Sequence, residues 1–231
     1  MHHLHFEAIE STQIYLKDHL KSLLEQDRNI LVSAEHQTHG VGRSGNTWIS
    51  NRDSLTLSLT ISPHQELTLT TIEIGLLITA FLNKKFQAEL KLKWPNDLMS
   101  PQGKKLGGII TYFYSPNCLV VGVGINFSPI LGVEKYSTSY IEASAELDKK
   151  EISRELYEYL LEHRIHDTQA VVDLFNQTCA HHLQMVELDE DQKKLIGVWK
   201  GIDPKGAALI EIFNKTHSFL SGSLTMLTKE H

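Results

Sequence analysis

The stretch HGVGRSGNTW, from His39 to Trp48, holds three glycines within six residues and an arginine among them. Glycine allows positive φ angles and a close approach of backbone N–H groups, so such a loop favours the binding of an anion. Gly40 and Gly45 have the spacing of a Walker A loop, but Asn46 stands where that motif has its lysine. The loop also lies between two predicted strands, whereas a Walker loop runs from a strand into a helix. The phosphate cradle of an ordinary NTPase is therefore excluded.

Predicted strands and helices flank this loop on both sides. Residues 29–37 and 54–62 predict strands, the second because apolar and polar residues alternate. A helix is predicted from about residue 11 to 26. The mostly apolar segment 67–86 predicts a largely buried helix, because it is too long for a strand. Further along we expect a strand and turn at 89–97, a β-hairpin at 105–128, and helices that begin near 148 and 170.

The end of the chain has a different character. From 183 onward, short β-prone runs alternate with the turn-like segments DED, DPKG and NKTHS, a pattern typical of a small antiparallel barrel. A chain of 231 residues suits one main core with a small appendage. The sequence therefore predicts an α/β (α+β) protein with a larger domain at 1–182 and a smaller one at 183–231.

Composition and charge exclude several classes of partner. A net charge of −6 gives no electrostatic footprint for non-specific binding of nucleic acid, so DNA is not expected as a partner. No apolar run approaches the roughly 20 residues needed to cross a bilayer, and the first twelve residues lack the pattern of a signal peptide. Cys118 and Cys179 lie in apolar surroundings without metal-ligand spacing, which favours buried thiols in a reducing cytoplasm.

Histidines occur in two groups that could be taken for metal sites. His2, His3 and His5 open the chain, but such a segment is more typical of an edge strand with solvated imidazoles. His181 and His182 are interpreted in the same way. We therefore expect no metal site at either group.

The glycine loop and the segment STQ at 11–13 carry the first candidate binding residues. STQ alone predicts only a helix cap. The loop combines Arg43, whose guanidinium offers forked donors to a carboxylate or phosphate, with Trp48, which offers a stacking surface for a planar ligand. A plain hairpin loop has no evident need for both residues, so we favour a binding function for the loop.

Three further segments carry candidate residues. Lys105 directly precedes a glycine pair, where its ammonium group can meet a ligand close to the backbone. Asn96 and Asp97 follow Lys93 in KWPND and supply hard oxygens that could reach Mg²⁺, although an Asx turn is the better interpretation from the sequence alone. The glycines of VVGVGIN, at 120–126, suggest close approach of a ligand or of another backbone, but the missing third glycine excludes a Rossmann fingerprint.

Taken in order, the segments STQ, EHQTHGVGRSGNTW, KWPND, KLGG, VVGVGIN, GIDPKGAALIE and SGSL resemble those of biotin protein ligases. The resemblance spans nearly the whole chain and is far more specific than any single motif. It implies a catalytic domain with a class II tRNA-synthetase-like fold, followed by a small SH3-like barrel. This agrees with the predicted boundary at residue 183.

The resemblance implies two half-reactions in the cytoplasm. Biotin reacts with Mg-ATP to give biotinyl-5′-AMP and pyrophosphate, and a lysine of the biotin carboxyl carrier protein of acetyl-CoA carboxylase then displaces AMP. Members of the family often dimerise, which nothing in this sequence decides. Members that repress transcription carry a winged-helix domain before the catalytic one, and only ten residues precede Ser11 here. The expectation is a monofunctional ligase without operator binding.

The resemblance also assigns roles to individual residues. Lys105, Arg43 and Asp97 take the catalytic positions, Asp97 as an organiser or a base. Biotin would contact Ser11, Thr12, Gln13, Gln37, Gly40, Val41, Gly42, Arg43 and Lys105. ATP or the adenylate would contact Arg43, Trp48, Lys93, Asn96, Lys105 and Asn126. No residue is assigned to a metal ion.

The sequence departs from the family pattern at several positions. Val41 stands where many members have the first arginine of the loop, Asn46 replaces another basic residue, and Gln13 replaces asparagine. Leu227 stands where some members place an arginine near ATP, a role that Lys229 could fill. These departures leave open a non-enzymatic sensor of biotin or biotinyl-AMP. A lipoate ligase on the same scaffold is the nearest alternative enzyme.

Overall fold

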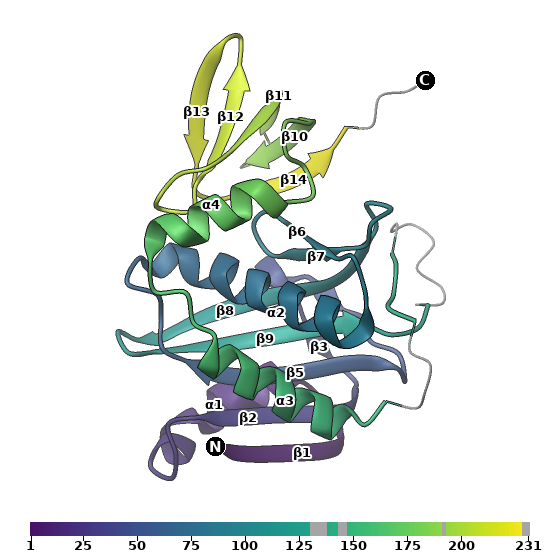
Figure 1. The fold of residues 1–231 in the computed structure, drawn as a ribbon. Coiled ribbons are helices and arrows are strands. Elements are labelled where there is room, and N and C mark those ends of the chain that lie inside the picture. Colours follow the sequence, from purple (N-terminus) through teal and green to yellow (C-terminus); the bar gives the residue numbers. More distant parts are fainter. Residues whose placement is uncertain (130–137, 143–146, 191–192, 228–231) are drawn as a thin grey trace.

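The computed structural model describes residues 1–129, 138–142, 147–190 and 193–227. Its largest unit is a seven-stranded mixed sheet with the strand order β1-β2-β5-β9-β8-β7-β6, and a five-stranded antiparallel sheet follows at the C-terminal end (Figure 1). The elements of the first part are β1 (His2–Ile9), α1 (Thr12–Leu24), β2 (Ile30–Gln37), β3 (Gly40–Val41), η1 (Arg43–Gly45), β4 (Thr47–Trp48), β5 (Ser54–Ile61), η2 (Leu67–Leu69) and α2 (Thr70–Phe86).

The remaining elements complete both sheets. They are β6 (Lys91–Lys93), β7 (Asp97–Met99), β8 (Lys105–Ser115), β9 (Cys118–Asn126), α3 (Lys149–Glu162), α4 (Thr168–Thr178), β10 (Met185–Glu190), β11 (Lys193–Ile202), β12 (Ala208–Ile212), β13 (Lys215–Phe219) and β14 (Ser223–Met226). The predicted strands at 29–37 and 54–62, the helix at 11–26 and the hairpin at 105–128 are thereby confirmed. The mixed α/β fold is confirmed as well.

The two faces of the large sheet are covered unequally. Leu31 of β2 points into the main core with helices α2 and α3, whereas its neighbours Ile30 and Val32 face the other way and pack with α1. This division follows from the period of two along a strand. Figure 1 shows α2 and α3 on one face, and α1, at the purple end of the chain, behind the sheet. Helix α1 contacts mainly β2, β5 and β9. The part of this face of the large sheet that β7 and β8 form is therefore not covered by α1, and the candidate site lies there.

The C-terminal strands form an open sheet among the residues described. Their order is β13-β12-β11-β10-β14, so β13 and β14 are its two edges. A bulge between Trp199 and Gly201 bends β11, but β14 has only four residues and pairs with β10 alone. The predicted antiparallel arrangement is correct, whereas closure into a barrel is not seen in this part of the structure.

The segment Leu67–Phe86, which contains η2 and α2, is long and apolar enough to cross a membrane by length and composition alone. The expectation that no apolar run approaches this length was therefore wrong. The window has a mean hydropathy of 1.3 and is 61% buried inside the protein. Its burial in the main core explains the apolar composition and confirms the predicted buried helix.

A buried ion pair joins this helix to the loop after α3. Arg164 donates from Nε and Nη2 to the two carboxylate oxygens of Glu73 at 2.7 and 2.8 Å, and the side chain of Glu73 is fully buried. The N–H of Ile165 donates a third hydrogen bond to Glu73, at 2.9 Å. The carboxylate is therefore fully compensated as long as Arg164 is present.

The N-terminal histidines belong to an edge strand, as predicted, but they are only partly exposed. β1 pairs in parallel with β2 at the edge of the sheet. His3 and His5 both hydrogen-bond the hydroxyl of Ser33 at 2.8 Å, and His5 also contacts Glu35 at 3.0 Å. No group of three histidine, cysteine or acidic residues that could hold a metal ion occurs in the described part of the chain.

His181 is buried between the two sheets and should make the stability pH-dependent. Burial, assisted by the charge of Lys93, lowers its pKa to about 3 from the ordinary 6.5. As the pH falls below 6.5, His181 binds a proton in the unfolded chain but stays neutral in the folded one. The free energy of unfolding must therefore fall. One such proton contributes a slope of up to about 1.4 kcal/mol per pH unit between pH 6.5 and 3.

Denaturant unfolding of the wild type and of His181→Phe at several pH values measures this effect. The free energy of unfolding of the variant should fall less steeply with decreasing pH than that of the wild type. Parallel curves would show that His181 does not titrate in this window. His3, whose pKa burial lowers to about 4, adds the same slope to both proteins and leaves their difference unaffected.

Candidate active site

A cavity of about 200 Å³ opens on the face of the large sheet that α1 leaves free. It is bounded by the N-terminus of α1, the glycine loop, the turn between β6 and β7, strands β8 and β9, and the start of β14. The predicted site residues that line it are Ser11, Thr12, Gln13, Gln37, Val41, Gly42, Arg43, Trp48, Lys93, Asn96, Asp97 and Lys105. Segments from distant parts of the sequence, including Leu57 and Ser58 of β5, thus meet at one cavity.

One end of the cavity is neutral and preorganised by hydrogen bonds. The Gln37 Oε1 atom accepts from the N–H of Thr12 at 2.7 Å and from its hydroxyl at 3.0 Å. The Thr12 hydroxyl also contacts that of Ser58, at 2.9 Å. With Oε1 engaged in this way, the Gln37 amide has its Nε2 donor available. The cap predicted for STQ is present too, since the Ser11 hydroxyl accepts from the N–H of Ile14.

The other end of the cavity is charged. Asp97 lies between two ammonium groups, with Oδ1 2.6 Å from Lys105 Nζ and Oδ2 3.0 Å from Lys93 Nζ. Burial opposes ionisation of Asp97, but the charges of Lys105 and Lys93 outweigh this effect and hold the pKa of the carboxyl below its ordinary value. Asp97 is thus an ionised, weakly basic carboxylate at neutral pH. This geometry favours an organiser of the two lysines over a general base.

The third cation, Arg43, comes from the glycine loop. The loop is a short hairpin in which β3 pairs with β4, and the N–H of Gly42 donates to the carbonyl of Asn46 at 2.7 Å. Ser44 and Gly45 have φ angles of 55° and 78°, which the left-handed turn requires. The guanidinium of Arg43 donates to the carbonyl of Gly222 and lies 3.4 Å from the hydroxyl of Ser223. The loop therefore reaches from the large sheet to the C-terminal one.

Two glycines of β9 make room for side chains of the site. A Cβ atom at Gly122 would lie 2.7 Å from Oε1 of Gln13, and one at Gly124 would lie 2.4 Å from the indole of Trp48. Close approach was predicted for these glycines, but by a ligand or another backbone. Side chains of the same chain approach them in the structure, and both glycines also line the cavity, so approach by a ligand stays a prediction. Gly40 has a similar role, because a Cβ there would lie 2.5 Å from the carbonyl oxygen of Trp48.

Two buried polar atoms in this region, Oε1 of Gln13 and Nε1 of Trp48, have no hydrogen-bond partner among the residues that the structure describes. Buried polar atoms are paired in the great majority of cases, so each unpaired one needs an explanation. Both side chains line the cavity, where a bound molecule could supply a donor and an acceptor. The two atoms are therefore evidence that the cavity is built for a ligand.

Gly40 and Asn126 are the predicted residues that do not line the cavity. Asn126 is buried at the end of β9, where its side-chain oxygen accepts from the hydroxyl of Ser54 at 3.3 Å. Its amide is thus partly used within the protein. Gly40 acts through packing under Trp48, as described above. Lys229, named as a substitute for the arginine missing at Leu227, lies outside the described residues.

The C-terminal residues that line the cavity were not predicted from the sequence. Lys93 donates to the carbonyl of Leu224 at 2.9 Å, and Ser223 and Leu224 both line the cavity. The motif SGSL at 221–224 was the available signal, but it suggests no role for backbone carbonyls. The C-terminal sheet thus contributes oxygen atoms to two of the three cations.

Comparison with known proteins assigns the family. Residues 5–126 match the model of the biotin/lipoate A/B protein ligase family, which is more than half of the chain. The chain belongs to this family. The protein named bifunctional ligase/repressor BirA of Escherichia coli is 27% identical over 252 residues, which cover 96% of this chain and 73% of BirA. A protein named biotin--[acetyl-CoA-carboxylase] ligase from Mycobacterium tuberculosis is 29% identical, over 86% of this chain and 79% of its own length.

Solved structures share the fold over nearly the whole chain. A biotin protein ligase from Aquifex aeolicus, solved in complex with biotin and ATP, superimposes with a TM-score of 0.78 at 24% identity. The alignment covers 98% of both chains. A synthetase from Helicobacter pylori, named for biotin acetyl coenzyme A carboxylase, gives a TM-score of 0.71 at 21% identity. These structures show that the fold is that of biotin protein ligases.

Proposed function

We propose that the protein is a biotin protein ligase that makes biotinyl-5′-AMP from biotin and ATP and transfers the biotinyl group to a lysine of the biotin carboxyl carrier protein of acetyl-CoA carboxylase. The observation that carries the proposal is the polarity of the cavity. Its neutral end, at Thr12 and Gln37, offers hydrogen bonds to an uncharged heterocycle. Its other end gathers Arg43, Lys93 and Lys105, which suit a carboxylate and a phosphate.

In the first half-reaction an oxygen of the biotin carboxylate attacks the α-phosphorus of ATP. The bond from that phosphorus to the bridging oxygen breaks, and pyrophosphate leaves with the electron pair. Two anions must approach each other, so nearby cations lower the barrier by offsetting their repulsion and stabilising the charge of the transition state. We assign this role to Lys105 and Arg43, while Lys93 contacts phosphate and Asp97 holds the two lysines in position.

In the second half-reaction the uncharged amine of the acceptor lysine attacks the carbonyl carbon of the mixed anhydride. An amide bond forms, the bond from the carbonyl carbon to the phosphate oxygen breaks, and AMP leaves as the amine loses its proton. The cations that stabilised the first transition state also stabilise the departing phosphate. Closing the glycine loop over the adenylate would protect the anhydride from water in the interval.

The residues of the site provide no dedicated cage for Mg²⁺. Both oxygens of Asp97 are engaged by lysines, and no other carboxylate lines the cavity among the described residues. We propose that Mg²⁺ enters with the phosphates of ATP, a common mode for this ion. None of the roles assigned above to protein residues depends on it.

The proposal extends to the organisation of the protein. The segment 1–182 forms the catalytic domain, with a class II synthetase-like core, and 183–231 forms a small SH3-like domain. Cytoplasmic location fits the two buried free thiols. Repression of transcription is not part of the proposal, and the net charge of −6 supports this. Retardation of a biotin-operon DNA fragment by the purified protein would contradict it.

Pyrophosphate release with Mg-ATP and different acids tests the proposed substrate. Biotin should support release, and neither lipoate nor octanoate should do so at the same concentration. Release with lipoate alone would identify a lipoate ligase instead. Tight binding of biotin without any release would favour a sensor.

A further inference from the structure

Lys149 is a buried lysine to which the mechanism above gives no role. It is the first residue of α3, its side chain is 5% exposed, and it does not line the cavity of the candidate active site. Two effects oppose a positive charge at this place. Burial removes the ammonium group from water, and the N-terminus of a helix itself carries partial positive charge. A lysine at this position therefore needs an explanation.

Three acceptors surround the ammonium group and compensate its charge. Nζ of Lys149 donates to the backbone carbonyls of Glu35, at 2.6 Å, and of Arg52, at 2.5 Å, and lies 3.4 Å from the Glu35 carboxylate. An ammonium group has three N–H donors, so all of them are engaged within the protein. The other carboxylate oxygen of Glu35 contacts His5 of β1 at 3.0 Å, which holds it in place. Lys149 thus links α3 to two further segments.

The two carbonyls belong to opposite ends of the glycine loop. Glu35 lies in β2, just before the loop, and Arg52 lies between β4, which closes the loop, and β5. We call the segments 35–37 and 49–53, which flank the loop, the loop base. A single ammonium group therefore binds both halves of the loop base and fixes their separation.

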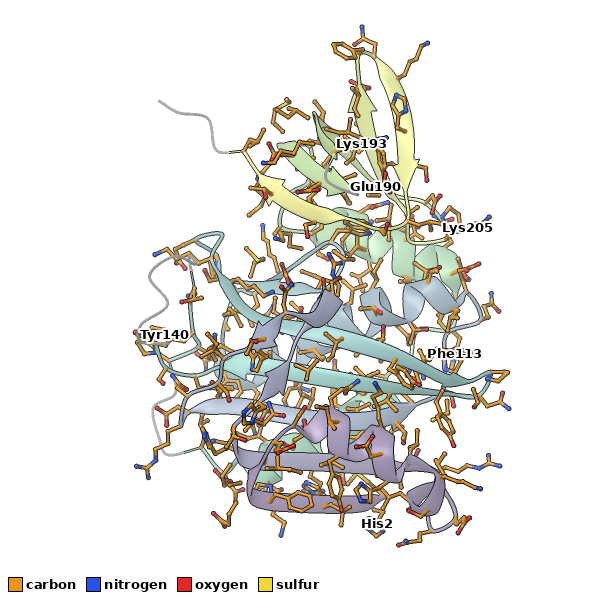
Figure 2. All side chains as sticks on the ribbon, turned by 180° about the vertical axis from the view of Figure 1, so that it is seen from behind. His2, Phe113, Tyr140, Glu190, Lys193 and Lys205 are labelled. Carbon is orange, nitrogen blue, oxygen red and sulfur yellow. The ribbon has the colours of Figure 1, made fainter. Side chains whose placement is uncertain are left out.

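Asn51 anchors the loop base independently of α3. Its Nδ2 atom donates to the hydroxyl of Ser128 and to the carbonyl of Pro129, both at 2.8 Å. These two residues directly follow β9. Figure 2 labels Tyr140 at this end of the large sheet, in the segment 138–142 that hydrogen-bonds the end of β9. The loop base is thus held from two sides, by a helix and by the sheet.

The loop base carries two side chains of the cavity. Gln37 ends its first half, and the Oε1 atom of Gln37 accepts from the N–H of Thr12. Trp48 directly precedes its second half and packs on Gly124. Both side chains line the cavity, whereas neither anchoring side chain does. A displacement of the loop base would therefore move two walls of the binding site without a change in any group that faces a ligand.

We propose that Lys149 is a positioning residue for biotin, which acts by holding the loop base while the tip of the glycine loop opens and closes. The proposal rests on the proposed function, which requires this loop to close over the adenylate. Lys149 touches no substrate and no reacting atom. A protein with a loose loop base spends part of its time in conformations that do not bind, so its dissociation constant rises by the inverse of the competent fraction. Once biotin and ATP are bound, the reacting groups have the wild-type arrangement.

Lys149→Met tests the proposal, because methionine keeps an unbranched apolar side chain and removes the three donors. The dissociation constant for biotin, measured by calorimetry well below the melting temperature, should rise by roughly five- to twenty-fold with one site per chain. Single-turnover release of pyrophosphate at saturating biotin and Mg-ATP should stay within about threefold of the wild type, since only uniform binding is lost. A merely structural role would lower the number of sites per chain and leave the dissociation constant unchanged.

Asn51→Ala keeps the test independent of the folding of the first variant. It removes the second anchor without exposing a buried charge, and it should also weaken biotin binding at a nearly unchanged saturating rate. Lys85→Met is the matched control. Lys85 pairs with Glu155 of α3 at 2.5 Å, but this pair joins α3 to α2 instead of to the loop base. Its affinity for biotin should equal that of the wild type.

The possible failures are distinguishable. An active wild type with unchanged biotin affinity in both anchor variants would overturn this proposal alone. An equal loss of affinity in Lys85→Met would overturn it as well, because any weakened contact of α3 would then have the same effect. So would a loss of the saturating rate as large as the loss of affinity. Wild-type protein that releases no pyrophosphate with biotin and Mg-ATP would overturn the proposed function, and this proposal with it.

Discussion

Replacing Lys105 by alanine should slow formation of biotinyl-5′-AMP by about 10²–10³-fold, the usual effect of removing a preorganised group that stabilises transition-state charge. The stability of the folded protein should change little. The Lys105 side chain is 43% exposed and, within the described part of the chain, forms an ion pair with Asp97 alone, so its loss should cost about 1 kcal/mol of stability or less. A residue that matters far more for the reaction than for folding is a catalytic residue.

Single-turnover pyrophosphate release at saturating biotin and Mg-ATP measures this loss, and denaturant unfolding measures the stability. Lys104→Ala is the matched control, since the neighbouring lysine is exposed and does not line the cavity. It should release pyrophosphate at the wild-type rate. If Lys105→Ala lost stability and activity in parallel, the catalytic assignment would be incorrect.

Arg164→Ala should have the opposite profile. It leaves the fully buried carboxylate of Glu73 with the N–H of Ile165 as its one remaining donor among the described residues, and breaking a buried ion pair in this way costs about 3–5 kcal/mol. For a protein of this size the melting temperature should fall by roughly 6–20 °C. Below that temperature the rate of adenylate formation should be retained, because neither residue lines the cavity.

Thermal and denaturant unfolding of Arg164→Ala, compared with Arg154→Ala, test this prediction. Arg154 pairs with Glu151 and Glu158 on the surface of α3, and its side chain is 40% exposed. Its replacement should lower the stability far less, because solvent screens an exposed ion pair. If the two variants had similar free energies of unfolding, the buried ion pair of Glu73 and Arg164 would contribute no more to stability than an exposed one.

Local patterns were sufficient to predict most of the fold. Alternating residues predicted β5 at 54–61, the long apolar run predicted α2, and Asp148 capped α3 as its spacing to Glu151 indicated, with a hydrogen bond of 2.9 Å. Each of these signals depends on residues close together in the chain. The hydrophobic period and the capping residues that form these elements also involve neighbouring residues, so the elements could be predicted locally.

The arrangement of the site could be predicted only in part. Motifs identified Lys93, Asp97 and Lys105, but not the position of the carboxylate between the two ammonium groups. The contact of Arg43 with Gly222 joins residues that are 179 apart in the sequence, and it uses a backbone carbonyl that carries no sequence signal. The packing of Gln13 on Gly122 and of Trp48 on Gly124 could not be predicted for a similar reason, since these side chains come from distant segments.

The intact mass of a biotin carrier domain, incubated with the protein, biotin and Mg-ATP, tests the central claim most directly. The mass should increase by one biotin less one water, at a single lysine, and should not change when ATP is omitted or that lysine is replaced by arginine. An unchanged carrier mass, with biotin bound tightly to the protein, would contradict the assignment as a ligase.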